Sequence, residues 1–345
     1  MLSKQNCPQL NNLSWNLTSY CNLRCVHCYI DASSLLVPQK TLFDEKTVKR
    51  VVWEAKQLGI KSIFLAGGEP LLLEELPKFI SIISAKNLSP CLCSNLTVLT
   101  KEQAKILRDA GLEMLSVGID HVEEKQLNKF RGEGVFKRVL EGISICREAG
   151  IPVNIDFTLT NLTKETVHNI HEFGIQHGCF QVSMKRYVPE GRGFKNKDKL
   201  LMDPLEYREC LVTWAKNSIA FAGKIKSFVH DPMYLVILEE LGWLDKKVHA
   251  EFGCKAWTTA GWLGISPSGD VHPCPLMRGF SLGNILEVPL TKVATRQHDQ
   301  LTIQSIPKEC VGCTAEFICH GGCKATRIRM NGLESRDIMC WKDKK

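Results

Sequence analysis

Residues 20–28 read Tyr20-Cys21-Asn22-Leu23-Arg24-Cys25-Val26-His27-Cys28. Three residues separate the first two cysteines of this stretch, and two residues separate the second from the third. Thiolates at such spacing bind a soft metal ion or an iron–sulfur cluster. Because a closed [4Fe–4S] cluster takes four protein ligands, three cysteines would leave one iron open. A small ligand with amine and carboxylate groups could occupy that position.

The segment just before the cysteines is short and largely apolar. Residues 13–18 read Leu13-Ser14-Trp15-Asn16-Leu17-Thr18, which predicts a strand. The cysteine loop should therefore follow the carboxyl end of a first strand, where active sites lie in barrel-like α/β folds.

The pattern C-x3-C-x2-C after a first strand, with the ring of His27 before the third cysteine, resembles the signature of radical S-adenosylmethionine (SAM) enzymes. The resemblance implies that Cys21, Cys25 and Cys28 ligate a [4Fe–4S] cluster that binds SAM. A structural zinc site is the alternative. Zinc sites usually close with a fourth Cys or His, and His27 is too near in sequence to serve easily.

The composition is that of a globular enzyme rich in metal ligands. A length of 345 residues allows one large domain and a smaller one. No membrane-spanning run or secretory pattern is present, so a cytoplasmic protein without a membrane partner is expected. Sixteen cysteines in a reducing compartment indicate metal binding over disulfides. The net charge of +7 is dispersed, which argues against a nucleic-acid partner and weakly favours a substrate with carboxylates.

Strand and helix patterns alternate over the first two hundred residues. Buried strands are predicted at 62–66, 91–95, 115–119, 153–159 and 181–186, and helices at 48–58, 76–83, 101–110 and 136–149. Together with the first strand, these units predict an α/β fold with a parallel sheet. The family resemblance implies the open (βα)6 partial barrel of radical SAM enzymes, whose gap admits large substrates.

A glycine-rich turn after the second predicted strand carries the next motif. Gly67-Gly68-Glu69-Pro70 lets backbone approach a ligand closely and supplies a carboxylate for an ammonium group. In this position it resembles the family's GGEP motif, which binds the amino group of the methionine part of SAM.

Further SAM contacts are implied only where residues match the family. Ser94 and Asn95 match a polar pair after strand three, although Leu96 stands where a glycine is usual. Arg131, which is followed by a glycine, matches an arginine that often meets the SAM carboxylate. The serine expected to contact ribose is missing from residues 118–121, and Ser116 is its only nearby stand-in.

Seven further cysteines dominate the C-terminal part. Their spacing resembles the SPASM extension of radical SAM enzymes, in which seven cysteines hold two auxiliary [4Fe–4S] clusters. The resemblance implies an outer cluster on Cys310, Cys313, Cys319 and Cys340 and an inner cluster on Cys254, Cys274 and Cys323. The inner cluster thus has either an open iron or a fourth ligand from elsewhere, with Cys210 and His272 as candidates.

These motifs divide the chain into a radical SAM domain at 1–200, a helical connector at 201–250 and a SPASM domain at 251–345. Asp203-Pro204-Leu205-Glu206 starts the connector helix, which should run to about residue 222.

The resemblance implies reductive cleavage of SAM to a 5′-deoxyadenosyl radical that abstracts hydrogen from a substrate, in an oxidoreductase or maturase with three clusters. It also implies a low-potential electron donor such as flavodoxin or ferredoxin. Oxidative modification of a peptide or protein side chain is favoured, and because Cys21 comes early, a peptide would need a separate carrier protein. Tailoring of tetrapyrrole side chains in haem or haem d1 synthesis is the alternative, because residues 188–193 resemble the corresponding segment of those enzymes. A non-catalytic iron–sulfur carrier is a third hypothesis, but a carrier has no need of a SAM-binding motif.

Overall fold

A computed structural model of the chain describes residues 10–34, 41–244, 261–300 and 306–342. Within them, one ten-stranded sheet has the order β12-β11-β10-β1-β4-β5-β6-β7-β8-β9. Neighbours from β10 to β9 are parallel, and β11 and β12 add antiparallel pairs at one edge. The strands span Asn12–Thr18 (β1), Ser62–Gly67 (β4), Ser89–Ser94 (β5), Met114–Gly118 (β6), Val153–Leu159 (β7), Gln181–Arg186 (β8), Lys226–His230 (β9), Trp262–Ile265 (β10), Asp270–His272 (β11) and Gly283–Asn284 (β12).

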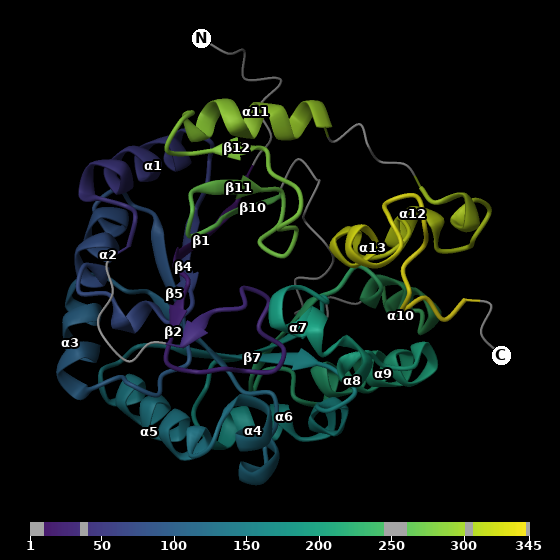
Figure 1. Cartoon of the computed structure of the whole chain (residues 1–345). Helices are drawn as coiled ribbons and strands as arrows, with labels where there is room; N and C mark the ends of the chain where they lie inside the picture. The colour runs from purple at the N-terminus through teal and green to yellow at the C-terminus, as the bar shows by residue number, and fades with distance from the viewer. Residues whose placement is uncertain (1–9, 35–40, 245–260, 301–305, 343–345) are drawn as a thin grey trace.

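A ring of helices surrounds the curved sheet (Figure 1). The helices that follow successive strands are α1 (Glu45–Gln57), α2 (Leu76–Ser84), α3 (Lys101–Asp109), α4 (Glu124–Arg131), α5 (Val135–Glu148), α6 (Ile170–Gln176), α7 (Gly191–Lys195), α8 (Lys197–Leu200) and α9 (Pro204–Ala220). Single 3₁₀ turns lie at Pro70–Leu72, Lys164–His168 and Lys308–Cys310. A separate two-stranded pair, β2 (Tyr20–Cys21) and β3 (Ser33–Ser34), flanks the cysteine loop.

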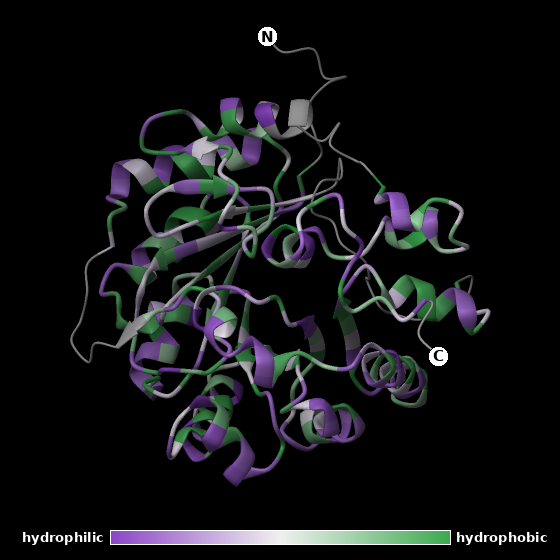
Figure 2. Cartoon of the chain, turned by 45° about the vertical axis from the view of Figure 1, so that its right-hand side comes forward, coloured by the Kyte–Doolittle hydropathy of each residue, from purple (hydrophilic) through white to green (hydrophobic). Residues whose placement is uncertain are grey.

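The first helix shows why these segments fold as they do. Asp44 caps α1 by accepting a hydrogen bond from the Thr47 amide at 2.8 Å, and Val48, Val51 and Val52 face the sheet and are buried. Hydrophobic and hydrophilic residues share the helices of the ring, as Figure 2 shows. The helix-facing sides of the strands supply the other half of the core.

All six predicted strands and all the predicted helices are present, and β7 and β8 have the predicted limits. The open parallel architecture is confirmed, but two more parallel strands extend it. β9 lies in the segment for which only helix was expected, because its residues Lys226–His230 read as a polar stretch. β10 pairs with β1, which places part of the predicted SPASM region in the main sheet.

The C-terminal part continues with a hairpin and short helices. Gly269, with φ of 91°, makes the predicted turn between β10 and β11. The helices are α10 (Tyr234–Glu240), α11 (Leu290–Gln300), α12 (Glu316–Cys319) and α13 (Lys324–Met330). No helix in the described ranges has the length and apolar character needed to cross a membrane.

Candidate active site and cluster-binding cysteines

The cysteine loop begins three residues after β1. Cys21 is buried, while Cys25 and Cys28 are half-buried. Burial raises the pKa of the Cys21 thiol to about 12 and that of Cys25 to about 11. Buried thiols ionise only when a cation compensates the charge, and Cys21 and Cys25 share one loop with Cys28, which suits an iron–sulfur cluster.

The glycine pair after β4 packs against the start of this loop. The Gly68 amide donates to the Thr18 carbonyl at 2.7 Å, and the Glu69 amide donates to the Tyr20 carbonyl at 2.8 Å. A Cβ atom on Gly68 would collide with the Tyr20 carbonyl. The glycines were expected to make room for a ligand, and here they make room for the backbone that leads into Cys21.

The carboxylate of Glu69 is fully buried among donors. It accepts hydrogen bonds from Ser94 Oγ at 2.7 Å, the Asn95 amide at 2.7 Å and the Leu71 amide at 3.0 Å. Burial outweighs these bonds and raises its pKa to about 7. A buried carboxylate so poised fits an arriving ammonium group, which would stabilise its charge. Pro70 begins the 3₁₀ turn that follows Glu69.

Asn95 joins this carboxylate region to the cysteine loop. Its side-chain amide donates to Asn22 Oδ1 at 2.8 Å and lies 3.8 Å from Cys21 Sγ. The next residue, Leu96, has a φ of 60°, the left-handed region that a glycine would occupy more easily. Its buried side chain packs against Gly142 on α5, where a Cβ atom would come within 2.6 Å of Leu96. Packing therefore holds Leu96 in the conformation usual for glycine.

His27 and Arg131 meet at a buried aspartate. The His27 ring stacks on Phe130 with centroids 4.5 Å apart, and its Nε2 lies 3.8 Å from Asp120. Burial lowers the pKa of His27 to about 4, so the ring is neutral at physiological pH. Arg131 donates to the same Asp120 at 2.6 Å. Ser116 instead accepts from the Asn154 side chain, within the polar inner face of the sheet.

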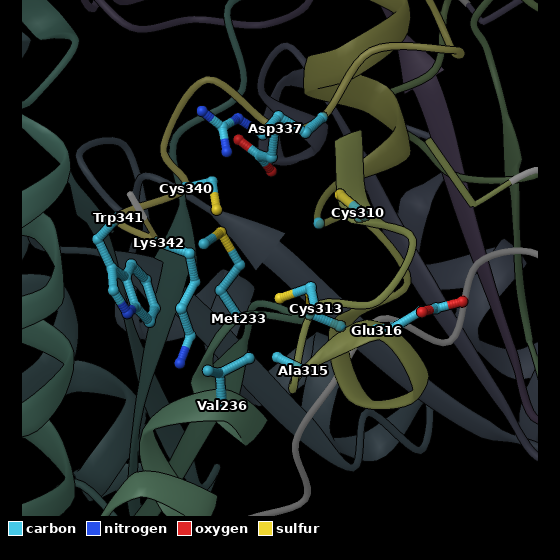
Figure 3. A pocket seen from close by; sticks show the side chains of 14 residues that line it. Met233, Val236, Cys310, Cys313, Ala315, Glu316, Asp337, Cys340, Trp341 and Lys342 are labelled. Carbon is cyan, nitrogen blue, oxygen red and sulfur yellow. The ribbon is translucent and has the colours of Figure 1, made fainter. Parts of the chain in front are cut away.

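Four of the predicted auxiliary cysteines surround one cavity. Cys310, Cys313, Cys319 and Cys340 all line it, together with Met233 and Trp341. The labelled thiols in Figure 3 face a common space. Burial and the neighbouring thiols raise the pKa of Cys310 to about 11. Among the residues with described positions, no three His, Cys, Asp or Glu side chains are arranged to hold a single metal ion.

Two predicted inner-cluster ligands, Cys274 and Cys323, lie in one small hydrophobic cluster with Val188 and Met277. The third, Cys254, lies outside the described residues. Of the two candidates for a fourth ligand, Cys210 is buried on α9 near Lys164, away from this cluster. His272 is already bonded through Nδ1 to the Phe280 carbonyl at 2.8 Å.

A buried ionic group connects the sheet to these C-terminal cysteines. Arg186 at the end of β8 donates to Asp337 at 2.5 Å and to Asp231 at 3.3 Å. Asp337 also accepts from the Cys323 amide at 2.7 Å. Tyr207 on α9 donates to Asp231, whose pKa burial raises to about 6 despite Arg186. The strand end and the Cys323 loop are thereby fixed to each other.

Several residues of the site had no sequence signal strong enough to single them out. Asp120 directly follows the predicted strand at 115–119, the usual place for a functional side chain, but its partners Arg131 and His27 lie far from it in the sequence. Phe130 directly precedes Arg131 and looked like an ordinary helix residue. Arg192 lay in a turn-rich segment whose contacts only the fold reveals.

Models of two known protein families match the N-terminal and C-terminal parts of the chain. The radical SAM superfamily model matches residues 15–174, and the SPASM iron–sulfur cluster-binding domain matches residues 254–314. The chain is a radical SAM enzyme with a SPASM domain. Radical SAM enzymes use SAM and a [4Fe–4S] cluster, so the alternative of a non-catalytic iron–sulfur carrier is set aside.

Relatives of this radical SAM enzyme match it nearly end to end. An AdoMet-dependent heme synthase of Methanosarcina barkeri is 29% identical over 96% of this chain and 95% of its own. An Fe-coproporphyrin III synthase of the same organism is 26% identical over 89% and 81%. A PqqA peptide cyclase of Granulibacter bethesdensis is 22% identical over 94% and 85%.

The fold also agrees with a solved structure. SuiB of Streptococcus suis bound to S-adenosylmethionine superposes with a TM-score of 0.76 and 19% identity, over 96% of this chain and 77% of SuiB. At this identity the likeness concerns the fold alone.

Proposed function

We propose that this radical SAM enzyme oxidatively trims carboxylate side chains of a tetrapyrrole. The observation that carries the proposal is the end-to-end similarity to the AdoMet-dependent heme synthase, which spans 96% of this chain. Peptide or protein modification, which the sequence favoured, becomes the second candidate. Its support is the PqqA peptide cyclase, which matches 94% of the chain at lower identity.

The inner face of the sheet offers aromatic surface for a flat macrocycle. The half-buried rings of Phe64, Phe228, His230 and Trp262 alternate with core residues on β4, β9 and β10, so they point away from the helices. Phe64 stacks on Trp262 at 5.0 Å between centroids, and His230 lies 6.0 Å from Trp262. The His230–Trp262 contact brings β9, one edge of the sheet, close to β10, the last parallel strand at the other end. Aromatic rings of this kind bind planar ligands by stacking.

The same face carries a cation suited to a carboxylate. Lys185 on β8 pairs with Asp156 on β7 at 3.3 Å, and the two side chains are 31% and 23% exposed. A partly exposed lysine can exchange its partner for a carboxylate of a ligand. The half-buried thiol of Cys93 lies on the same face of β5, as does the buried thiol of Cys91, whose register partner is Phe64.

We infer that Cys21, Cys25 and Cys28 hold the SAM-binding cluster. Glu69, Asn95 and Arg131 line the expected place of SAM, with Gly67, Gly68 and Pro70 shaping that turn and Ser94 fixing Glu69. When bound there, the cluster and SAM supply a carbon-centred radical for hydrogen abstraction. The protein's own part is to hold the three cysteines on one loop beside the buried Glu69, and to hold a neutral His27 against Phe130.

We further propose auxiliary clusters on Cys310, Cys313, Cys319 and Cys340 and on Cys254, Cys274 and Cys323. Anaerobic reconstitution should then give roughly twelve irons per chain, as three four-iron clusters. About four irons, or stoichiometric zinc, would contradict the assignment. A cytoplasmic flavodoxin or ferredoxin is the proposed electron donor.

The substrate is tested with an iron coproporphyrin as the probe. Reconstituted protein is reduced, supplied with SAM and the probe, and the tetrapyrrole is analysed by mass spectrometry for loss of carboxyl groups. Absorbance titration without SAM measures binding. Lys185→Met should weaken binding about tenfold, whereas Lys226→Met, at the exposed start of β9, should leave it unchanged.

A probe that stays intact while SAM is cleaved would reject the tetrapyrrole proposal. Transfer of label from SAM to a precursor peptide, presented with its carrier protein, would then support the second candidate. If Lys185→Met and Lys226→Met bind the iron coproporphyrin equally well, Lys185 does not contact one of its carboxylates. This conclusion holds for any reaction product.

A further inference from the structure

A short helix packs against the outside of the cysteine loop. In α7, which follows β8, the amides of Arg192 and Gly193 both donate to the Cys28 carbonyl, at 2.9 and 3.2 Å. The adjacent Asn196 donates through its side chain to the Val26 carbonyl at 3.1 Å. Loop carbonyls that would otherwise need water are satisfied by this one segment.

The side chain of Arg192 spans the loop from one end to the other. Its guanidinium donates to the Cys25 carbonyl at 3.2 Å and to the Ala32 carbonyl at 2.6 Å. Its Nε lies 3.3 Å from Asp31, and only 13% of the side chain is exposed. The rigid fork of an arginine can hold these separated acceptors at once, which the single ammonium of a lysine cannot.

Glycine makes the close approach of α7 feasible. Gly191 has a φ of 55°, and a Cβ atom there would collide with the Tyr29 carbonyl and come within 2.8 Å of the Cys28 carbonyl. A Cβ atom on Gly193 would come within 3.0 Å of the His27 carbonyl. Gly191 and Gly193, two positions apart, therefore have the same role, which is to let the backbone of α7 lie against the backbone of the loop.

The opposite side of α7 contacts the auxiliary region. The Arg329 guanidinium lies over the Phe194 ring at 3.9 Å and 3.8 Å from the Glu190 carboxylate. Arg329 belongs to α13, which begins directly after Cys323. The helix is therefore held from both sides, with the cysteine loop on one and α13 on the other.

We propose that α7 is a clamp for the cysteine loop and that Arg192 is its positioning residue. A cluster held by three cysteines needs its thiols at fixed separations, and this loop contains only one two-residue strand, β2, to provide them. Contacts to the carbonyls of Cys25, Cys28 and Ala32 fix the loop from behind, where they leave the thiols free. Arg192 therefore acts on the SAM-binding cluster through the backbone of the loop.

Iron content and paramagnetic resonance test the clamp. In reconstituted Arg192→Ala, about a third of the iron, the share of one cluster among three, should be lost, along with the part of the reduced resonance spectrum that changes on adding SAM. Arg192→Lys should retain an intermediate, broadened SAM-responsive signal. Lys195→Gln is the matched control, because Lys195 pairs with the same Asp31 at 2.6 Å but contacts no loop carbonyl; its iron and spectrum should equal those of the unaltered chain.

A second pair of variants distinguishes loss of the proposed clamp from a general loss of stability. Gly191→Ala should reproduce the loss seen in Arg192→Ala. Gly150→Ala introduces the same substitution at a φ of 70° with nothing within 4 Å, so it should retain full iron and the SAM response. Full iron with an unchanged SAM response in Arg192→Ala would overturn the proposal. Loss of all iron in Arg192→Ala and Gly191→Ala, together with a lowered melting temperature of the iron-free chains, would overturn it too, because the role would then be general folding.

Discussion

Arg131 donates a hydrogen bond through Nε to the carboxylate of Asp120 at 2.6 Å, and their side chains are 11% and 0% exposed. The pKa of Asp120 is lowered although burial opposes this, because the Arg131 guanidinium and the Thr158 amide stabilise its charge. The guanidinium lies directly over Gly118, where any side chain would collide with it. Arg131 is thus oriented by Asp120 before SAM arrives, with its Nη atoms near the end of β6.

Replacing Asp120 tests how much the Asp120–Arg131 ion pair contributes to the free energy of unfolding. Asp120→Ala leaves Arg131 buried without its partner, and we expect unfolding of the iron-free chain to require about 3–5 kcal/mol less. Urea denaturation measures the change. The control is Glu124→Ala, which breaks the exposed pair with Lys137 and should lower stability by less than about 1 kcal/mol. Similar losses in both variants would show that Arg131 does not depend on Asp120.

Glu69→Gln should weaken SAM binding to the reconstituted enzyme. The substitution keeps the shape of the side chain but removes the negative charge and places an amide donor opposite one of the present donors. Loss of a charge-assisted hydrogen bond is worth about 1.5–3 kcal/mol, or roughly 10- to 100-fold in dissociation constant. Equilibrium dialysis with labelled SAM provides the measurement. Glu102→Gln, on the exposed start of α3, serves as the reference, and equal affinities would exclude Glu69 from the SAM site.

Arg186→Met should destabilise the junction between the sheet and the C-terminal cysteines. It leaves Asp231 and Asp337 buried without their cation, for which we expect a loss of about 3–5 kcal/mol in unfolding free energy. Arg208→Met removes a more exposed partner of Glu240 and should lower stability by less than about 1 kcal/mol. If both variants unfold at the same urea concentration, the buried group adds nothing to stability.

His171 should make the chain sensitive to mild acid. It is buried beside Trp214 and bonded to Ser227, and burial lowers its pKa from 6.5 to about 4. The unfolded chain therefore takes up a proton between pH 6.5 and 4 that the folded chain does not, so stability falls as pH falls through this window. Between pH 7 and pH 5 the contribution is about 2 kcal/mol. The unfolding free energy of His171→Leu should fall by about 2 kcal/mol less between pH 7 and pH 5 than that of the unaltered chain. If the unfolding free energy changes equally with pH in both proteins, His171 is not the group responsible.

The parts of the fold that repeat could be predicted from the sequence. β7 and β8 were predicted to the residue because Val153–Leu159 and Gln181–Arg186 are buried in a parallel sheet and keep one simple pattern. The family resemblance grouped Cys310, Cys313, Cys319 and Cys340, and these four side chains line one cavity. A local sequence pattern is enough to predict a feature when the residues that form it are also close together in the sequence.

The remaining features depend on contacts between distant segments. Nothing in residues 226–230 indicates that β9 extends the sheet, because β8 supplies its hydrogen bonds. Gly67 and Gly68 were expected to approach a ligand, and their packing against the backbone of Thr18 and Tyr20 becomes visible only in the fold. The Leu96 conformation is a similar case, because Gly142 on α5 provides the space that its side chain fills.

The pairing of β1 with β10 has a consequence for the synthesis of this protein. Asn12 pairs on one side with Ser62 and on the other with Trp262. At roughly 5–20 residues per second on the ribosome, the second partner of β1 emerges about 10–50 s after the strand itself. During that interval the hydrogen-bonding edge of β1, which ends at the cysteine loop, is available to other chains. A nascent chain stalled before residue 262 would therefore be the aggregation-prone species, and overproduction in cells would benefit from slower growth or a holding chaperone.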